Sequence, residues 1–185
     1  HGLLPKLHVD QLTAGGGAEL AAELECVSAD HLDHASDAGL RALAAAKTVA
    51  VLLPGASMFV GDPFPDAKRF REAGVEIALS TDFNPGTSPT DDLALMGTMA
   101  MSTMGMTSEE ALAAVTVNAA KAIAREDLGV LAPGKRADLV IWDAPNLEHL
   151  FWHFGDRHAA TVLKNGKVVF EKDAAPECRP TWPPP

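Results

Sequence analysis

The stretch TVAVLL, residues 48–53, decides the fold of this chain because it is an almost continuous run of apolar residues. Such a run is expected of a strand that is buried on both faces, as in a parallel sheet covered by its crossover helices. Short runs of this kind alternate with helical runs from residue 5 to about residue 125. The alternation predicts an α/β protein built from four βα units around a parallel sheet.

The other elements are placed around this strand by propensity and by capping signals. The expected strands are residues 6–9, 25–28, 48–53 and 75–80. The expected helices are residues 18–24, 37–46, 67–73, 91–102 and 108–124, and a loop rich in Pro and Gly is expected from 54 to 65. Ser36 is a typical N-cap and Gly74 a typical residue after a helix end, so two of these boundaries have a physical cause.

The pattern changes after residue 128, where a strand at 139–142 precedes a hairpin at 161–170. Asn165-Gly166 between two alternating runs is the strongest short signal for a hairpin turn. We therefore expect three parts. Residues 1–127 form βα units, residues 128–172 form a small β segment, and residues 173–185 form a Pro-rich tail that is extended or disordered.

Charge and composition restrict the class of partner. The 185 residues carry 15 − 25 = −10 formal charges and 47% hydrophobic side chains, which allows a real core. An acidic chain is a poor ligand for nucleic acid or anionic membranes, so a small-molecule substrate is favoured. No apolar run approaches the roughly 20 residues of a spanning helix, which predicts a cytoplasmic protein. The chain begins with His rather than Met and enters a strand-like segment within a few residues, so its N-terminus looks cut.

Metal-competent side chains stand at three expected strand ends. His8 ends the first strand, with Asp10 and Gln11 just beyond it, the second runs into His31, and Asp82 follows the fourth. Taken singly, each histidine is more simply a hydrogen-bonded residue. Together they point at the mouth where parallel strands deliver functional groups, and imidazole with carboxylate suits a divalent cation such as Zn²⁺ or Fe²⁺.

Two further groups of residues invite a metal interpretation, but we expect packing for both. His149 and His153 recur at i, i+4 on a predicted helix, with His158 close behind, and this spacing can bind zinc. No Glu-x-x-His context accompanies them and aromatic residues lie between them, so helix packing is favoured. The methionines at 96, 99, 101, 104 and 106 are expected to fill gaps in the core.

Four motifs, in order and spacing, resemble those of the imidazolonepropionases of the amidohydrolase superfamily. They are HVDQL at 8–12, SADHL at 28–32, LLPGA at 52–56 and STDFNPGTSP at 80–89, of which the last is the most specific. The resemblance covers the chain to about residue 172. It implies the C-terminal half of a (β/α)₈ barrel with part of a small β-sandwich, and hydrolysis of 4-imidazolone-5-propanoate to N-formimino-L-glutamate in histidine degradation.

The resemblance also implies roles for single residues. His8 and Asp82 would be ligands of the divalent metal, Zn or Fe, and Asp82 would also carry a proton to the leaving nitrogen. His31 would polarise the water and the substrate carbonyl. Residues in substrate contact would be Gln11, Asn84, Gly86 and Thr87. Some relatives have Glu at the position of Gln11, and water activation is assigned to that Glu. An amide cannot act as a base, so Gln11 would only form hydrogen bonds.

The chain departs from the family by what it does not contain. The His-x-His pair of the first barrel strand and the first part of the β-sandwich have no counterpart here, so we expect the polypeptide alone to be inactive or nearly so. Its two outer strands would be open edges. A missing N-terminal half or a homodimer would cover them. The alternatives are another cyclic amidohydrolase or aminohydrolase, or a non-catalytic half-barrel.

Overall fold

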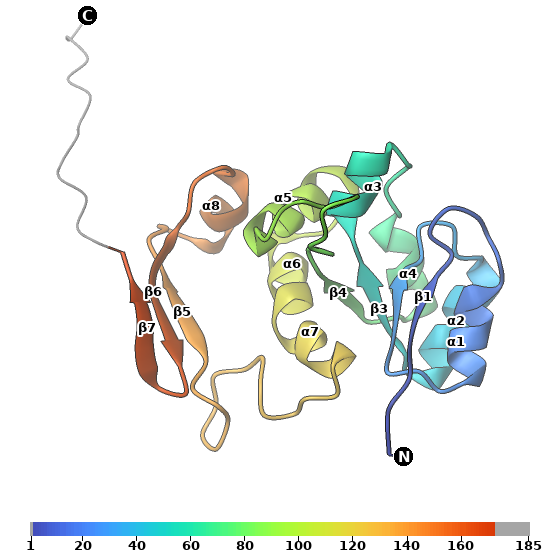
Figure 1. The fold of residues 1–185 in the computed structure, drawn as a ribbon, viewed down its shortest axis with the longest axis horizontal. Helices are drawn as coiled ribbons and strands as arrows, with labels where there is room; N and C mark the ends of the chain where they lie inside the picture. The colour runs from blue at the N-terminus through green and yellow to red at the C-terminus, as the bar shows by residue number, and fades with distance from the viewer. Residues whose placement is uncertain (1, 173–185) are drawn as a thin grey trace, which may run out of the picture.

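The computed structural model describes residues 2–172, and its centre is a parallel sheet with the order β1-β2-β3-β4 (Figure 1). The strands are β1 (Lys6–Val9), β2 (Ser28–His31), β3 (Val49–Leu52) and β4 (Ile77–Leu79). All of their pairings are parallel, so the carboxyl ends of the strands lie along one edge of the sheet. The expected α/β class with a parallel sheet is confirmed.

Seven helices of the described chain accompany this sheet: α1 (Gly17–Glu23), α2 (Asp37–Ala46), α3 (Pro54–Val60), α4 (Ala67–Ala73), α5 (Leu93–Thr103), α6 (Ser108–Val115) and α7 (Val117–Ala122). Their ends follow from local chemistry. The Ser36 hydroxyl accepts the Gly39 N–H at the start of α2, and Gly74 ends α4 in the left-handed conformation, as the sequence predicts.

The main core lies on one face of the sheet, which we call the outer face, and the opposite face is the inner face. Alternate strand residues such as Leu7, Ala29 and Leu52 pack against α1, α2, α4, α5 and α6, with Phe70 of α4 fully buried among them. The methionines at positions 96, 99, 104 and 106 are buried as well. Their prediction as core residues is confirmed, and Met101 packs at the edge of a smaller cluster.

The inner face of the sheet is divided into a polar and an apolar half. On β1 and β2, the inward positions include Lys6 and Asp30, whose charged groups lie 3.9 Å apart. On β3 and β4 they are apolar, and Val51 and Ala78 pack with Ala122 of α7. Within residues 2–172, only the apolar half is covered by other elements, and the polar half with His8 is open.

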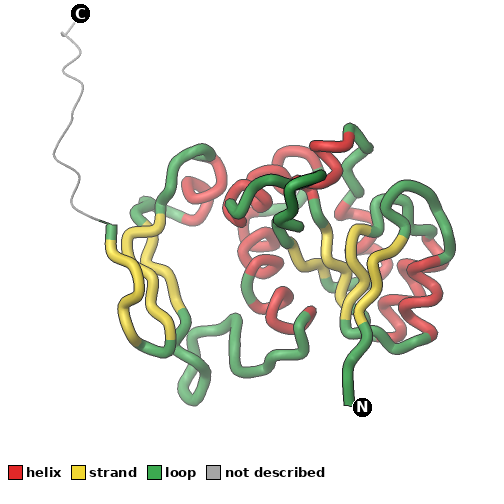
Figure 2. Tube along the Cα trace, in the orientation of Figure 1, coloured by secondary structure: helices red, strands yellow, loops and turns green. Residues whose placement is uncertain are grey.

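A second sheet lies at the far end of the molecule from β1, with α5, α6 and α7 between the two (Figure 1). It is antiparallel and consists of β5 (Leu139–Trp142), β6 (Ala159–Lys164) and β7 (Lys167–Glu171). Asn165 and Gly166 both have positive φ, at 51° and 73°, which is the turn that the sequence predicts. A long loop joins α7 to β5 (Figure 2), and α8 (Leu147–Trp152) lies between β5 and β6.

Besides shifts of one or two residues at other ends, three larger differences from the sequence-based expectation have a physical cause. The second strand begins at Ser28 rather than residue 25, because Glu25 turns left-handed (φ 49°) and the Cys26 N–H still donates to Ala21. The expected loop at 54–65 contains α3, which starts with proline at its first turn, where the missing N–H costs nothing. The expected helix at 108–124 is interrupted at Thr116, whose φ and ψ of −124° and −92° are not helical.

Among residues 2–172, no helix is both long and apolar enough to cross a membrane. The expected tail at 173–185 lies outside the described residues.

Candidate functional site

The site begins with His8, whose exposed ring stands on the inner face of β1 near the carboxyl edge of the sheet. Its Nε2 lies 2.8 Å from Oε1 of Gln11, so the amide of Gln11 holds the ring. The ring centre of His8 is 4.2 Å from that of His31. The structure therefore brings together two of the histidines that the sequence places at neighbouring strand ends.

His31 reaches His8 because its backbone breaks the alternation of β2. In a regular strand, His31 would share the face of Ala29, which points into the outer core. A φ of 76° at His31 and of 65° at Leu32 turns the chain instead. The ring is buried, and this burial, followed by the nearby His8, lowers the pKa of His31. His31 is therefore neutral at pH 7 and keeps one ring nitrogen free to accept a proton.

The carboxylate of Asp33 lies close to the His31 ring. Oδ2 of Asp33 is 3.8 Å from Nδ1 of His31, and the Ser57 hydroxyl donates to its Oδ1 at 2.5 Å. Burial raises the pKa of Asp33, while the bond from Ser57 and the neighbouring His31 oppose that rise. Sequence reasoning missed this pair, because Ser57 belongs to α3, where a loop was expected.

Asp82 is the first residue of a loop that Asn84 organises. The Asn84 side chain accepts the backbone N–H groups of Gly86 and Thr87, both at 2.8 Å. Its amide donates to the Asp82 carbonyl at 2.6 Å and to Asp82 Oδ2 at 3.3 Å. Asp82 has a φ of 50°, and its negative charge raises the pKa of His31, which opposes the larger lowering by burial and by His8.

Asp10, in contrast, is already fully engaged. Its buried carboxylate accepts the backbone N–H groups of Gly15, Gly17 and Ala18 at 2.8–3.1 Å. These bonds fix the turn into α1, where the orphan N–H groups of a helix start need acceptors. Asp10 is therefore a structural residue, and only Gln11 of the two residues after β1 faces His8.

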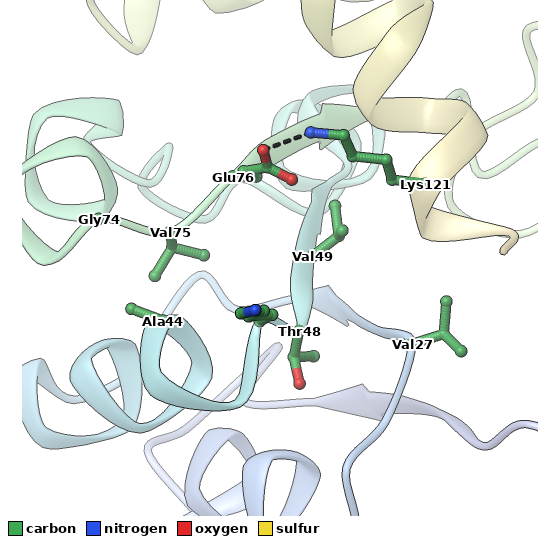
Figure 3. A pocket seen from close by; sticks show the side chains of 9 residues that line it. Val27, Ala44, Thr48, Val49, Gly74, Val75, Glu76 and Lys121 are labelled. Atoms are coloured by element: carbon green, nitrogen blue, oxygen red, sulfur yellow. Dashed lines mark hydrogen bonds and ion pairs between the residues drawn. The ribbon is translucent and has the colours of Figure 1, made fainter. Parts of the chain in front are cut away.

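The opposite edge of the sheet carries a hollow of about 520 Å³ (Figure 3). It is lined by residues that precede the strands, including Val27, Thr48 and Val75. Lys121 of α7 forms an ion pair with Glu76 above it. This hollow lies at the amino ends of the strands, so it is separate from the group around His8, His31 and Asp82.

Within residues 2–172, one group brings three metal-competent side chains within 4.8 Å of one another, and it consists of His149, His153 and His158. His8, His31 and Asp82 do not form such a three-ligand group.

Comparison with known proteins identifies the family. Residues 13–169 match the family model described as the amidohydrolase family, which is well over half of the chain. This chain belongs to the amidohydrolase family. The match includes the His31 and Asp82 segments, and His8 lies just before it.

Curated relatives of this amidohydrolase chain are imidazolonepropionases. That of Geobacillus kaustophilus is 52% identical over 169 residues, which are 91% of this chain and 40% of the relative. That of Anaeromyxobacter dehalogenans is 47% identical over 181 residues, which are 96% of this chain and 43% of the relative. The chain thus spans about two fifths of the length of these relatives.

Solved structures share the fold of this amidohydrolase chain at low sequence identity. An atrazine chlorohydrolase from Arthrobacter aurescens, crystallised with zinc and atraton, superimposes with a TM-score of 0.80 at 18% identity, over 92% of this chain and 45% of the other. An adenosine deaminase from Xanthomonas campestris, with bound zinc, gives 0.79 at 21% identity, over 91% and 46%. Both confirm an amidohydrolase fold for the described residues.

Proposed function

We propose that the protein to which this chain corresponds is an imidazolonepropionase, which hydrolyses 4-imidazolone-5-propanoate to N-formimino-L-glutamate. The observation that carries the proposal is the convergence of His8 and His31, with Asp82 in electrostatic reach, at one edge of the parallel sheet. Identities of 52% and 47% to curated imidazolonepropionases support this substrate over others of the family.

The donors at this edge fit a divalent cation. A neutral imidazole and a carboxylate are the ligand types that Zn²⁺ and Fe²⁺ accept. His8 and Asp82 would hold the ion, and the remaining ligands would come from outside this chain. A divalent cation in this place polarises a carbonyl and makes water a stronger acid.

Each remaining residue has a role that its contacts support. Asp82 takes the proton of the attacking water and passes it to the leaving ring nitrogen, a transfer that suits a carboxylate held by Asn84. His31, kept neutral by burial, orients the water and the carbonyl. Gln11 contributes a hydrogen bond, because an amide is not a base.

The loop after Asp82 is preformed for the substrate. The side-chain oxygen of Asn84 holds the Gly86 and Thr87 N–H groups in a fixed turn. A rigid turn loses little entropy when a substrate binds to it, and its donors are already placed. We assign Asn84, Gly86 and Thr87 to substrate and product contact.

We further propose that residues 1–127 are the C-terminal half of a (β/α)₈ barrel and residues 128–172 part of a small β-sandwich. In the part of the chain that the structure describes, β1 and β4 each pair with one neighbour, so each leaves an edge open for strands from elsewhere. Those strands would come from the missing N-terminal half, or from a second copy in a homodimer. The cytoplasmic location expected from the sequence stays a prediction.

Complementation tests this proposal. The chain would be co-purified with a polypeptide that covers the first three fifths of the Geobacillus kaustophilus relative. We expect imidazolonepropionate hydrolysis from the pair, with neither part active alone, and at least a hundredfold loss for His8→Ala and Asp82→Asn in the pair. A matched control, His34→Gln, changes a histidine outside the site and retains activity.

Two results would contradict the proposal. A stable pair with stoichiometric metal but no turnover of imidazolonepropionate would refute the substrate. Full activity of the pair with Asp82→Asn would refute the role of that carboxylate. Stoichiometric metal and turnover in the chain alone would show that the site is complete within it.

A further inference from the structure

Three histidines outside the candidate active site converge beside the second sheet. His149 lies on α8, His153 is the residue that ends this helix, and His158 immediately precedes β6. The ring centres are 5.1 Å apart for His149 and His153, 5.4 Å for His149 and His158, and 5.3 Å for His153 and His158. The rings thus form a nearly equilateral triangle.

These separations match those of imidazoles around one metal ion. With a Zn–N bond of about 2.0–2.1 Å and tetrahedral angles, ring centres lie roughly 5 Å apart. The candidate ligand nitrogens are within 4.8 Å of one another, so the rings close on an ion by small side-chain rotations. His153 is exposed and His149 is half-buried, which gives both rings room to adjust.

The backbone that presents the rings is held in place by packing that does not involve them. Leu150 and Phe151 of α8 are buried against α6, and the Thr98 hydroxyl donates to the Phe151 carbonyl at 2.6 Å. The Asp143 N–H donates to the His158 carbonyl at 2.7 Å. Helix packing was expected of the three histidines, and the apolar part of that packing comes from Leu150 and Phe151.

The partner of one ring is that of a metal-bound histidine. Nε2 of His158 lies 2.9 Å from the His153 carbonyl, so this nitrogen carries the proton and Nδ1 has the lone pair. Nδ1 of His153 lies 3.7 Å from the Asp156 carboxylate, which is too far for a hydrogen bond. A backbone carbonyl or a carboxylate behind the ring is the usual partner that sets the tautomer of a ligating histidine.

We propose that His149, His153 and His158 form a second metal site, which binds Zn²⁺ or a similar late first-row cation with solvent in the fourth position. Imidazole nitrogens select such ions over Mg²⁺, which prefers oxygen ligands. The bound ion ties the 153–158 turn to the end of α8. This site stands at the end of the molecule that carries the second sheet, away from β1 (Figure 1).

Zinc titration of the chain tests the site in a background that lacks the candidate active-site ligands. In the double variant His8→Gln/Asp82→Asn, isothermal titration calorimetry should show one Zn²⁺ per chain. Adding His153→Gln or His149→Gln should weaken zinc binding by roughly tenfold or more. Removing a residue that only hydrogen-bonds a metal ligand can already lower metal affinity by that factor. The matched control His34→Gln should leave it unchanged, and millimolar Mg²⁺ should not compete.

Thermal unfolding supplies a second readout. Zinc that binds the folded chain raises the Tm by mass action, and this rise should disappear in His153→Gln and in His149→Gln. Circular dichroism without zinc checks that each variant keeps its fold. The proposal is overturned if the double variant shows no saturable zinc binding. It is also overturned if adding His149→Gln or His153→Gln leaves the zinc affinity of the double variant unchanged. Either result leaves the proposed hydrolase function untouched.

Discussion

At the scale of single residues, the candidate site depends on unusual backbone conformations. His31, Leu32 and Asp82 all have positive φ without being glycine. Such residues cost about 1–3 kcal/mol each and persist where the surrounding structure holds them. Here the strain turns His31 toward His8 and places Asp82 at the head of its loop. The rings of His8 and His31 meet because the chain turns sharply at the end of β2.

Asn84 should be essential to the loop that follows Asp82. Asn84→Ala removes the acceptor for the Gly86 and Thr87 N–H groups, and each such bond is worth about 0.5–1.5 kcal/mol. We expect faster limited proteolysis within residues 82–90 and about 1–2 kcal/mol less stability in urea. Asn84→Asp keeps both acceptor bonds and should protect the loop better. Equal cleavage of wild type and Asn84→Ala would contradict this role.

Asp33 should make stability depend on pH. Its pKa is raised in the folded state, so the folded chain binds a proton that the unfolded chain releases. Stability is therefore full below the unfolded pKa of about 3.9 and is lost as pH rises through the folded pKa. Asp33→Asn avoids this loss and still accepts from Ser57. We expect the variant to be more stable than wild type at pH 7, by a margin that shrinks toward pH 4. A margin independent of pH in urea titrations would refute this.

At the scale of elements, α5 and α8 pack closely where Gly97 faces the ring of Phe151. A Cβ added to Gly97 would lie 2.4 Å from Cε1 of Phe151. Overpacking of this kind costs about 1–3 kcal/mol, which exceeds the gain that alanine brings to a helix. We expect Gly97→Ala to destabilise the chain in urea and Gly97→Ala/Phe151→Leu to recover part of the loss. If both variants are equally unstable, the ring is not the obstacle.

The elements also show what the sequence can predict. Strand 48–53, the Ser36 cap and the Asn165-Gly166 hairpin were predictable because each has a local cause. Helix α3 was not, because its Pro and Gly residues are typical of loops. It forms since its first residues are buried, and a Cβ on Gly55 would lie 2.8 Å from the Ser88 hydroxyl.

The same limit applies to the site. His8, His31 and Asp82 were identified from their positions at strand ends. Asp33 and Ser57 meet across 24 positions in the chain, a contact that depends on α3. The triangle of His149, His153 and His158 likewise needs the turn that brings the chain back from α8 to β6. From the sequence, helix packing was favoured for these histidines, because no Glu-x-x-His context accompanies them and aromatic residues lie between them.

At the scale of the whole molecule, the second sheet presents apolar side chains to solvent. Exposed residues of this sheet include Ile141, Trp142, Val168, Val169 and Phe170. Clusters of exposed apolar residues mark surfaces that are covered by another chain or segment. A sheet of this kind, together with the open edges of β1 and β4, predicts that the chain associates with itself when it is purified alone.

Val169→Lys tests this association, because Val169 is 63% exposed on β7, an edge strand of its sheet. A lysine there adds charge to an edge, which opposes pairing between chains, and it removes no buried contact. We expect sedimentation velocity to show less concentration-dependent association for the variant, with an unchanged Tm. Lys167→Gln on the same strand removes a charge and should associate at least as strongly as wild type. If Val169→Lys associates like wild type, the second sheet is not the contact, and the edges of β1 and β4 become the surfaces to change next.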